Sequence, residues 1–358
     1  MSELDGPDYL TLKKQIALWA EELGFDAIGV SDIELSEDHQ FLRSWLEKKY
    51  HATMAYMGNH LELRRYPEKL VPNTIRIISA RMQYLSSSIA QSQSVLKDNQ
   101  TAYISRYALG RDYHKLMRKR LAKLAEKIRQ LHPELHYRVF ADSAPVLEKP
   151  IANKAGLGWI GKHSLVLDET AGSFFFIGEI FTNLNLPVDE LQTNSCGQCR
   201  ACREICPTDA IVADKVVDSS RCISYLTIEN KGPIPEPLRA AVGNRIFGCD
   251  DCQLFCPWNR FAQLTTETDF QPRHGLQDAS LLELFSWSES TYLKNTAGSA
   301  LRRAGYLGWR RNLAVALGNA NYHPDILSAL QSSDRENSEL LEEHISWAIH
   351  QQFLKKEN

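Results

Sequence analysis

Cysteine is absent from most of this 358-residue chain, because none occurs before Cys196 or after Cys256. Long apolar runs are absent too. The densest one, Phe174 to Phe181, is interrupted by Gly178 and Glu179 and is too short to span a bilayer. The first residues carry neither the basic stretch nor the apolar segment of a secretory signal. These absences predict a cytoplasmic protein that does not associate with membranes and whose thiols stay reduced.

A strong excess of one charge is also missing, since the formal net charge is −3. With 43% hydrophobic and 24% charged residues, the composition is that of an ordinary globular chain, long enough for two or three domains. The charge balance disfavours a generally basic nucleic-acid binder, so contact with a polyanion would depend on local basic patches. We expect the protein to act as a monomer.

The cysteines that are present form two runs and one isolated position. Residues 196–207 read C-G-Q-C-R-A-C-R-E-I-C-P, which is the C-x2-C-x2-C-x3-C-P run of bacterial ferredoxins. Residues 249–257 read C-D-D-C-Q-L-F-C-P and repeat the C-x3-C-P ending. Ile246 stands where a ferredoxin would place the leading cysteine of the second run, and Cys222 restores the total to eight.

Crosswise ligation of these thiolates predicts two [4Fe-4S] clusters, because the fourth cysteine of such a run ligates the neighbouring cluster. A zinc ribbon uses two C-x2-C pairs and has no need of the additional cysteines and trailing prolines. A disulfide framework requires an oxidising compartment. The expected ligand sets are Cys196, Cys199, Cys202 and Cys256 for one cluster, and Cys206, Cys222, Cys249 and Cys252 for the other.

Patterning along the chain predicts three domains. Residues 1–185 alternate helices and strands, which is typical of an α/β (or α+β) domain. Residues 186–265 form a ferredoxin-like domain around the clusters, and residues 266–358 are helical. Helices are expected at 10–23, 42–49, 112–131 and 148–155, strands at 25–30, 74–79, 101–105, 136–141, 164–167 and 173–181, and a Ser- and Gln-rich surface excursion at 86–99.

Two features of the first domain indicate a ligand site. Ligands of α/β domains lie beyond the carboxyl ends of the strands, and Asp142 follows the strand expected at 136–141. Taken alone, Asp142 is more typical of an Asx turn before Pro145. The glycines at 156, 158 and 161 match G-x-G-x-x-G, but they follow a helix and precede a strand, the reverse of a dinucleotide site. They suit close approach of the backbone to a large flat ligand.

Basic residues gather in two places. The helix expected at 112–131 has a basic face, of which most is expected to be solvated surface. In the third domain, helices expected at 281–285, 299–304, 310–320, 324–330 and 339–353 are similar to HEAT-type repeats, with a plain helical cap as the alternative. Next to Tyr306 and Trp309, an arginine cluster suits contact with phosphates and bases: Arg302, Arg303, Arg310 and Arg311.

Further segments of the chain form, together with the cysteine runs, a combination of motifs that is typical of one protein family. They are R-Y-A-L-G-R-D-Y-H at 106–114, A-D-S-A-P at 141–145, K-A-G-L-G-W-I-G-K at 154–162, R-C-I-S-Y at 221–225, A-L-R-R-A at 300–304 and R-N-L-A-V-A-L-G-N at 311–319. With the cysteine runs, they make the chain resemble the epoxyqueuosine reductase family over nearly its full length. That resemblance implies a cobalamin-dependent iron–sulfur enzyme, related to reductive dehalogenases, which removes the epoxide oxygen of epoxyqueuosine at the wobble position of tRNA.

The resemblance also implies roles for single residues. Asp142 matches the proton donor of the family, and its pKa would need to be raised. Arg64 would pair with a corrin side chain, and Tyr107 lies where some relatives carry a cysteine. The remaining expected cofactor contacts are Lys162 and Ser164 in the glycine loop, Val166 and Ile177 on strands, and Ser220 and Asp250 beside cluster cysteines. Each has an ordinary alternative as surface, loop or core.

Deoxygenating an epoxide takes two electrons and two protons, so the resemblance also implies an external low-potential electron donor. Two other functions stay open. A two-cluster electron carrier is disfavoured by the size of the first domain, and bound cobalamin would distinguish it. A cobalamin-dependent small-molecule reductase is disfavoured by the helical tail with its arginines, and tRNA binding would distinguish it.

Overall fold

An antiparallel sheet forms the centre of the first part of the chain in the computed structural model, which describes residues 8–357. Its strands are β1 (Ala27–Ser31), β2 (Arg76–Gln83), β7 (Phe175–Thr182) and β4 (Tyr137–Phe140), in the order β1-β2-β7-β4. Every neighbouring pair is antiparallel. The predicted alternation of strands and helices is present, but the carboxyl ends of neighbouring strands lie at opposite edges, so the α/β argument for a common ligand edge was wrong.

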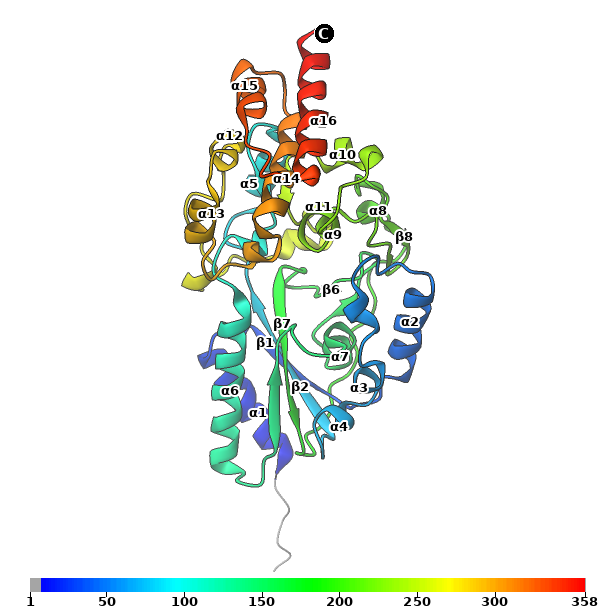
Figure 1. The fold of residues 1–358 in the computed structure, drawn as a ribbon. Helices are drawn as coiled ribbons and strands as arrows, with labels where there is room; N and C mark the ends of the chain where they lie inside the picture. Colours follow the sequence, from blue (N-terminus) through cyan, green and yellow to red (C-terminus); the bar gives the residue numbers. More distant parts are fainter. Residues whose placement is uncertain (1–7, 358) are drawn as a thin grey trace, which may run out of the picture.

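Helices cover both faces of this sheet (Figure 1). On one face lie α1 (Tyr9–Glu22) and α6 (Tyr113–Leu131), whose apolar side chains share a core with Ile180 of β7. On the other face lies α7 (Glu148–Lys154), in close contact because a Cβ on Gly29 would stand 1.8 Å from the carbonyl oxygen of Ala155. Leu131, the last residue of α6, is 60% exposed.

Four shorter helices flank the sheet: α2 (Ser36–Glu47), α3 (Leu61–Arg65), α4 (Pro67–Leu70) and α5 (Ile89–Lys97). The prediction of a surface excursion at 86–99 was wrong. Ser88 caps α5 by accepting a hydrogen bond from the backbone N–H of Gln91, and Ser92 and Val95 are buried. The sequence did not predict this helix, because serine side chains can pack against a core without producing the helical spacing of apolar residues.

Short strands outside the main sheet connect distant parts of the chain. β3 (Tyr103–Ile104) pairs in parallel with β10 (Arg245–Phe247), and β5 (Trp159–Ile160) pairs with β6 (Val166–Leu167). Gly156 and Gly158 thus lie between a helix and a strand, as predicted, whereas Gly161 lies in the connection between β5 and β6. One-turn 3-10 helices occur at Ala55–Gly58, Arg106–Ala108, Pro257–Phe261, Thr268–Phe270 and Ala300–Arg303.

The cysteine region consists of short elements. They are α8 (Ala201–Glu204), β8 (Ile211–Ala213), β9 (Val216–Val217), α9 (Ile223–Ile228), α10 (Glu236–Val242) and α11 (Asp251–Leu254). Each cysteine run forms one helical turn, α8 containing Cys202 and α11 containing Cys252, and the two turns pack against each other. This contact brings the two runs together.

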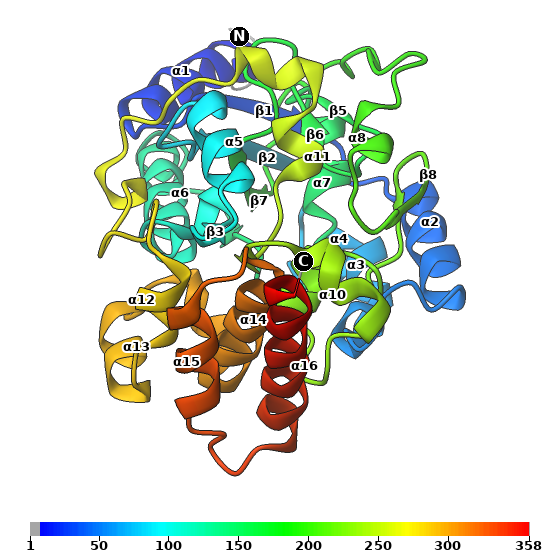
Figure 2. The same ribbon diagram turned by 90° about the horizontal axis from the view of Figure 1, so that it is seen from above.

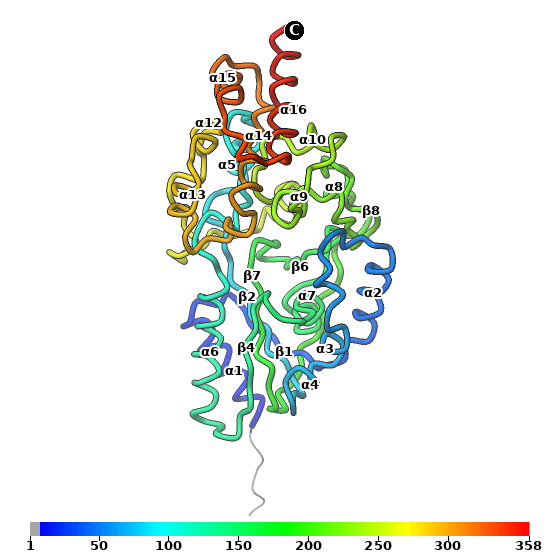
Figure 3. The backbone as a smooth tube through the Cα atoms, in the orientation of Figure 1, coloured from blue at the N-terminus to red at the C-terminus, as the bar shows by residue number. Residues whose placement is uncertain are grey.

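The tail is helical, as predicted, with α12 (Leu281–Phe285), α13 (Glu289–Asn295), α14 (Gly305–Asn319), α15 (Pro324–Ser332) and α16 (Glu339–Lys356). Figures 2 and 3 show these helices gathered at one end of the molecule. α14 is buried at every position from Gly308 to Gly318, and its core includes Phe247 of β10. The likeness to HEAT repeats stays a prediction. Among residues 8–357, no helix has both the length and the apolar character needed to cross a bilayer.

Candidate functional site

Four thiols line a small cavity of about 80 Å³ beside the β5–β6 pair. Trp159 Nε1 lies 3.4 Å from Cys196 Sγ, and Trp258 packs edge-on against Trp159. Burial, together with the neighbouring cysteines, raises the pKa of Cys202 to about 11. The lining thiols are Cys196, Cys199, Cys202 and Cys256, the first set that crosswise ligation predicts.

The other four thiols lie on the wall of a larger cavity, of about 790 Å³. They are Cys206, Cys222, Cys249 and Cys252, the second predicted set. Burial raises the pKa of Cys249 and Cys252 well above its usual range, so their thiolates require a compensating cation such as iron. No three Cys, His, Asp or Glu side chains in the described part of the chain are grouped to hold a single metal ion. Ligation of clusters by these sets stays a prediction.

The larger cavity lies between the sheet domain and the cysteine region. Apolar side chains of α2 form one wall, among them Phe41 and Trp45, and Trp45 Nε1 donates to the carbonyl of Val217 at 2.7 Å. Leu147 and Pro150 line the α7 side. A broad cavity with apolar walls and a few polar groups is the usual form of a site for a large organic cofactor.

One buried polar atom at this cavity lacks a partner. The backbone N–H of Leu165 donates to His163 Nδ1 at 3.2 Å, so the neutral imidazole carries its proton on Nε2. Burial lowers the pKa of His163 to about 4, and Nε2 has no hydrogen-bond partner among the described residues. His163 lines both cavities, so this N–H is available to a group bound in either one.

Three of the predicted cofactor residues line the larger cavity: Tyr107, Ser164 and Asp250. Asp250 is 2% exposed, and its carboxylate accepts hydrogen bonds from Tyr103, Ser105 and the backbone of Arg106. These bonds fix the 3-10 turn that carries Tyr107. Asp250 therefore supports the cavity wall with oxygens that are already engaged.

The other predicted cofactor residues, Asp142 among them, do not line the larger cavity, so its lining does not support a cofactor contact for them. Lys162 lines the smaller cavity and pairs with Asp214 at 3.4 Å. Arg64 is buried and donates to the backbone carbonyls of Tyr56, Asn59 and Val146. Val166 and Ile177 pack into a hydrophobic cluster, and Ser220 is exposed while its neighbour Ser219 lines the cavity.

Asp142 follows β4 and contacts His114 of α6. Its Oδ2 lies 3.1 Å from His114 Nε2, while His114 Nδ1 lies 2.5 Å from Oδ1 of Asp112, the N-cap of α6. Hydrogen bonds to Asp112 and then Asp142 raise the pKa of His114 to about 9. An imidazolium flanked by two carboxylates is therefore the neutral-pH state of this site.

The environment of Asp142 differs from the predicted one in two ways. Its pKa is lowered, chiefly by the hydrogen bond from His114, although a raised value was predicted. Its side chain is 59% exposed and bonds to His114, whereas the Asx turn would direct the carboxylate to its own loop. Sequence reasoning missed His114, although Asp112 two residues earlier was a visible helix cap.

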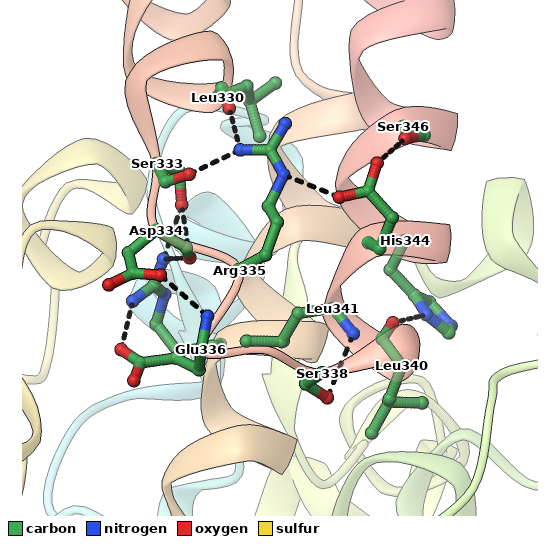
Figure 4. Close-up of polar contacts among 12 residues, drawn as sticks. Leu330, Ser333, Asp334, Arg335, Glu336, Ser338, Leu340, Leu341, His344 and Ser346 are labelled. Carbon is green, nitrogen blue, oxygen red and sulfur yellow. Dashed lines mark hydrogen bonds and ion pairs between the residues drawn. The ribbon is translucent and has the colours of Figure 1, made fainter.

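The predicted arginine cluster is divided by the fold. Arg311 is fully buried and donates to the carbonyls of Leu226, Asn230 and Gly232. Arg310 is 6% exposed and donates to Ser333 at 2.5 Å and to Asp334, in the α15–α16 connection drawn in Figure 4. Both were predicted to contact nucleic acid. That prediction is wrong for them, because their donors are used inside the protein.

The other two arginines are exposed. Arg302 bonds to Thr296 at 3.1 Å, and Arg303 forms a bidentate pair with Glu229 at 2.6 and 2.9 Å. The charge of Arg303 contributes to the lowered pKa of Asp142, which places this arginine near the Asp142–His114 pair. Three exposed lysines of α6 form no ion pair with any described residue: Lys115, Lys119 and Lys123.

Comparison with known families is consistent with this division of the chain. Residues 64–143 match the family described as epoxyqueuosine reductase QueG, DUF1730, and this segment contains His114 and ends just after Asp142. Residues 195–259 match the family described as 4Fe-4S double cluster binding domain and contain all eight cysteines. The two matches thus cover the Asp142–His114 pair and both thiol sets.

Curated relatives and solved structures cover nearly the whole chain. The epoxyqueuosine reductase of Vibrio cholerae is 56% identical over 97% of this chain and 94% of its own length. The epoxyqueuosine reductase of Escherichia coli is 55% identical over 98% of this chain and 92% of its own length. The structure of epoxyqueuosine reductase from Streptococcus thermophilus superimposes with a TM-score of 0.87 at 26% identity, covering 96% and 91%. An epoxyqueuosine reductase crystallised with an epoxyqueuosine-modified tRNA-Tyr stem loop superimposes with a TM-score of 0.87 at 23% sequence identity. That match covers 96% of this chain and 91% of the other.

Proposed function

Because the chain belongs to the epoxyqueuosine reductase family, we propose that it reduces epoxyqueuosine to queuosine at the wobble position of tRNA, with two [4Fe-4S] clusters and cobalamin as cofactors. The observation that carries the proposal is the Asp142–His114 pair, which lies close to the larger cavity without lining it. Tyr107 and Lys149 line that cavity, and Asp142 acts electrostatically on both. A proton source thus stands near a space for a large cofactor, and one thiol set forms part of the wall of that space.

The residues present fit both cofactors. Each thiol set surrounds a cavity, and the larger cavity offers apolar walls with the unpartnered N–H of His163. Cobalamin, when bound, supplies strongly reducing organometallic chemistry, and the clusters supply single electrons. Phe41, Trp45, Leu147 and Tyr107 would hold the corrin, and the eight cysteines would hold the clusters. The size and lining of this cavity disfavour a simple electron carrier.

The side chains define how protons are delivered. Opening the epoxide and releasing its oxygen as water takes two protons and two electrons. At neutral pH the proton lies on Nε2 of His114, 3.1 Å from the Asp142 carboxylate. Asp142 accepts that proton and passes it to the leaving oxygen, after which His114 is reprotonated from solvent. Asp142 is thus a proton relay, and His114 is the group that holds the proton.

Surface charge supports contact with tRNA near this site. Arg302 and Arg303 are exposed, and Arg303 lies near Asp142. Lys115 and Lys119 extend the positive surface along α6, whose first turn carries His114. We propose that phosphates flanking the modified base contact these residues, with the helical tail as a HEAT-like support. The exposed Cys199 marks where an external low-potential donor would approach a cytoplasmic, monomeric enzyme.

The direct test is conversion of epoxyqueuosine-containing tRNA by anaerobically prepared protein that carries iron, sulfide and cobalamin and is supplied with a low-potential chemical reductant. Digestion and mass spectrometry of the nucleosides should show loss of one oxygen atom from the modified base. The variant Asp142→Asn, matched for cofactor content, is the control. Protein that carries both cofactors and binds tRNA but leaves the epoxide intact would contradict the proposal.

A further inference from the structure

Two glutamates lie behind Asp142, and neither belongs to the mechanism described so far. Glu148 is the first residue of α7, and Glu179 lies in β7 on the sheet face that α7 covers. Oε1 of Glu148 accepts the backbone N–H of Asp142 at 2.5 Å. Glu179 is fully buried, and its electrostatic neighbours are Glu148 and Asp142. The chain therefore places two carboxyls together beneath the relay residue.

No cation of the described residues forms an ion pair with either carboxyl, although His114, Lys149 and Arg64 act electrostatically on Glu148. Neither oxygen of Glu179 has a hydrogen-bond partner among the described groups. Lys149 of α7 donates to the carbonyl of Ser164 at 2.8 Å, and Arg64 of α3 donates to backbone carbonyls. From α6, the His114 ring is engaged by Asp112 and Asp142, and Tyr113 brings only a neutral hydroxyl. Two adjacent carboxylates, with no ion pair to either and no donor to Glu179, would repel strongly, and one proton between them removes that repulsion.

The backbone of Asp142 needs the support that Glu148 gives. Its φ angle is +58°, in the left-handed region that residues with a side chain adopt at a cost. The hydrogen bond from its N–H to Glu148 is the contact that fixes this conformation and aims the carboxylate at His114. A displacement of Glu148 would therefore displace Asp142.

We propose that Glu148 and Glu179 share one proton, and that this shared proton fixes Glu148 so that it holds Asp142 in place. Glu148 is thus a positioning residue for Asp142, and Glu179 acts through Glu148. The catalytic consequence rests on the function proposed above, whereas the shared proton does not depend on it.

The sign of the pH dependence follows from the charges. Burial raises the pKa of Glu148 to about 7 and that of Glu179 well above its usual range. As the pH rises, the pair loses its last proton, the carboxylates repel, and the support of Asp142 weakens. Turnover should therefore show an alkaline decline that depends on this pair, in addition to the decline set by deprotonation of His114 near 9.

Infrared spectroscopy tests the shared proton without substrate. A protonated carboxyl absorbs apart from a carboxylate, and its band shifts in heavy water. The wild-type protein should show this band at pH 6 and lose it as the pH rises. E148Q and E179Q should each remove it, because a glutamine amide donates the hydrogen bond permanently. E169Q, which changes an exposed glutamate, is the control and should leave the band in place. A band unaffected by both E148Q and E179Q, or no band at pH 6, would overturn the proposal.

The pH profile of kcat tests the positioning role. E148A should lower kcat about tenfold or more with KM for tRNA little changed, because Asp142 loses a hydrogen bond that orients it. In E148Q and E179Q the decline that depends on the pair should disappear, which leaves only the decline set by His114. A purely structural role predicts lower stability with the pH profile unmoved, and that result would overturn the positioning role. If the wild-type protein converts no epoxyqueuosine, the proposed function fails while the infrared result still decides the shared proton.

Discussion

Nε2 of His114 lies 3.1 Å from Oδ2 of Asp142, although 28 residues separate them in the chain. The contact joins the first turn of α6 to the loop after β4. It makes Asp142 a carboxylate that receives a proton, where the sequence had indicated an acid with a raised pKa. The predictions below follow from this contact and from the two thiol sets.

His114 should titrate near pH 9, because Asp112 and Asp142 both stabilise its imidazolium. The added stability is complete below the pKa of about 6.5 expected for the unfolded chain and is lost as the pH rises through about 9. NMR of ring-labelled histidine measures the pKa, which Asp112→Asn and Asp142→Asn should each lower. The exposed His136 provides the control. An unchanged His114 pKa in both variants would contradict the assignment.

His114→Asn should lower turnover by on the order of 100-fold, the scale of general acid–base catalysis. Its amide donates a hydrogen bond to Asp142 but does not release a proton at neutral pH. Clusters, cobalamin and tRNA binding should persist. Single-turnover conversion followed by nucleoside mass spectrometry measures the loss, and His136→Asn serves as the matched control. Turnover within a few fold of wild type would move the proton source away from His114.

Asp142→Asn should still carry both cofactors and bind tRNA but lose turnover by on the order of 100-fold or more. The asparagine side chain keeps the shape and accepts the hydrogen bond from His114, yet it cannot relay a proton. The same single-turnover measurement applies. Near-normal conversion would remove Asp142 from proton delivery.

Cys222→Ser should impair the cluster assigned to Cys206, Cys249 and Cys252 more than its neighbour, since all four thiols line the larger cavity. Wild-type protein should contain about eight iron and eight sulfide per chain. Iron analysis and electron paramagnetic resonance of the reduced protein measure the loss. Cys199→Ser is the matched variant for the other set. Equal loss of both signals in each variant would argue against two separate ligand sets.

Arg303→Ala should weaken tRNA binding and reduce its salt dependence by about one unit in the log–log slope, as expected for one lost phosphate contact. Arg302→Ala with Arg303→Ala should reduce it by about two. Binding isotherms over a range of salt concentrations give the slope. An unchanged slope in the double variant would assign tRNA contact to the lysines of α6.

Arg311→Ala should lower the free energy of unfolding by about 3 kcal/mol, because three backbone carbonyls lose their buried donor. Denaturant unfolding of the cofactor-loaded protein measures it. Arg302→Ala, at an exposed position, is the control and should change stability much less. If folded Arg311→Ala protein showed a smaller salt dependence of tRNA binding, Arg311 would contact the tRNA, and its assignment to a structural role would be wrong.

The sequence alone determined the features that depend on local spacing. The cysteine runs predicted the same two sets of four thiols that line the two cavities, because each run folds into a single helical turn with fixed offsets. The helix α6 and the helices α14 and α16 of the tail were also expected from local patterns. Such patterns reflect interactions within a few residues along the chain.

The tertiary structure decided which side chains meet and which are buried. Arg302, Arg303, Arg310 and Arg311 look alike in the sequence, but the packing of α14 on α9 encloses Arg311, and the α15–α16 connection covers Arg310. The partnership of Asp142 with His114, and of Glu148 with Glu179, joins α6, α7 and β7 across the sheet. Burial and electrostatic environment depend on neighbours far apart in the chain, so local patterns left both the charge of Asp142 and the carboxyl pair beneath it undetermined.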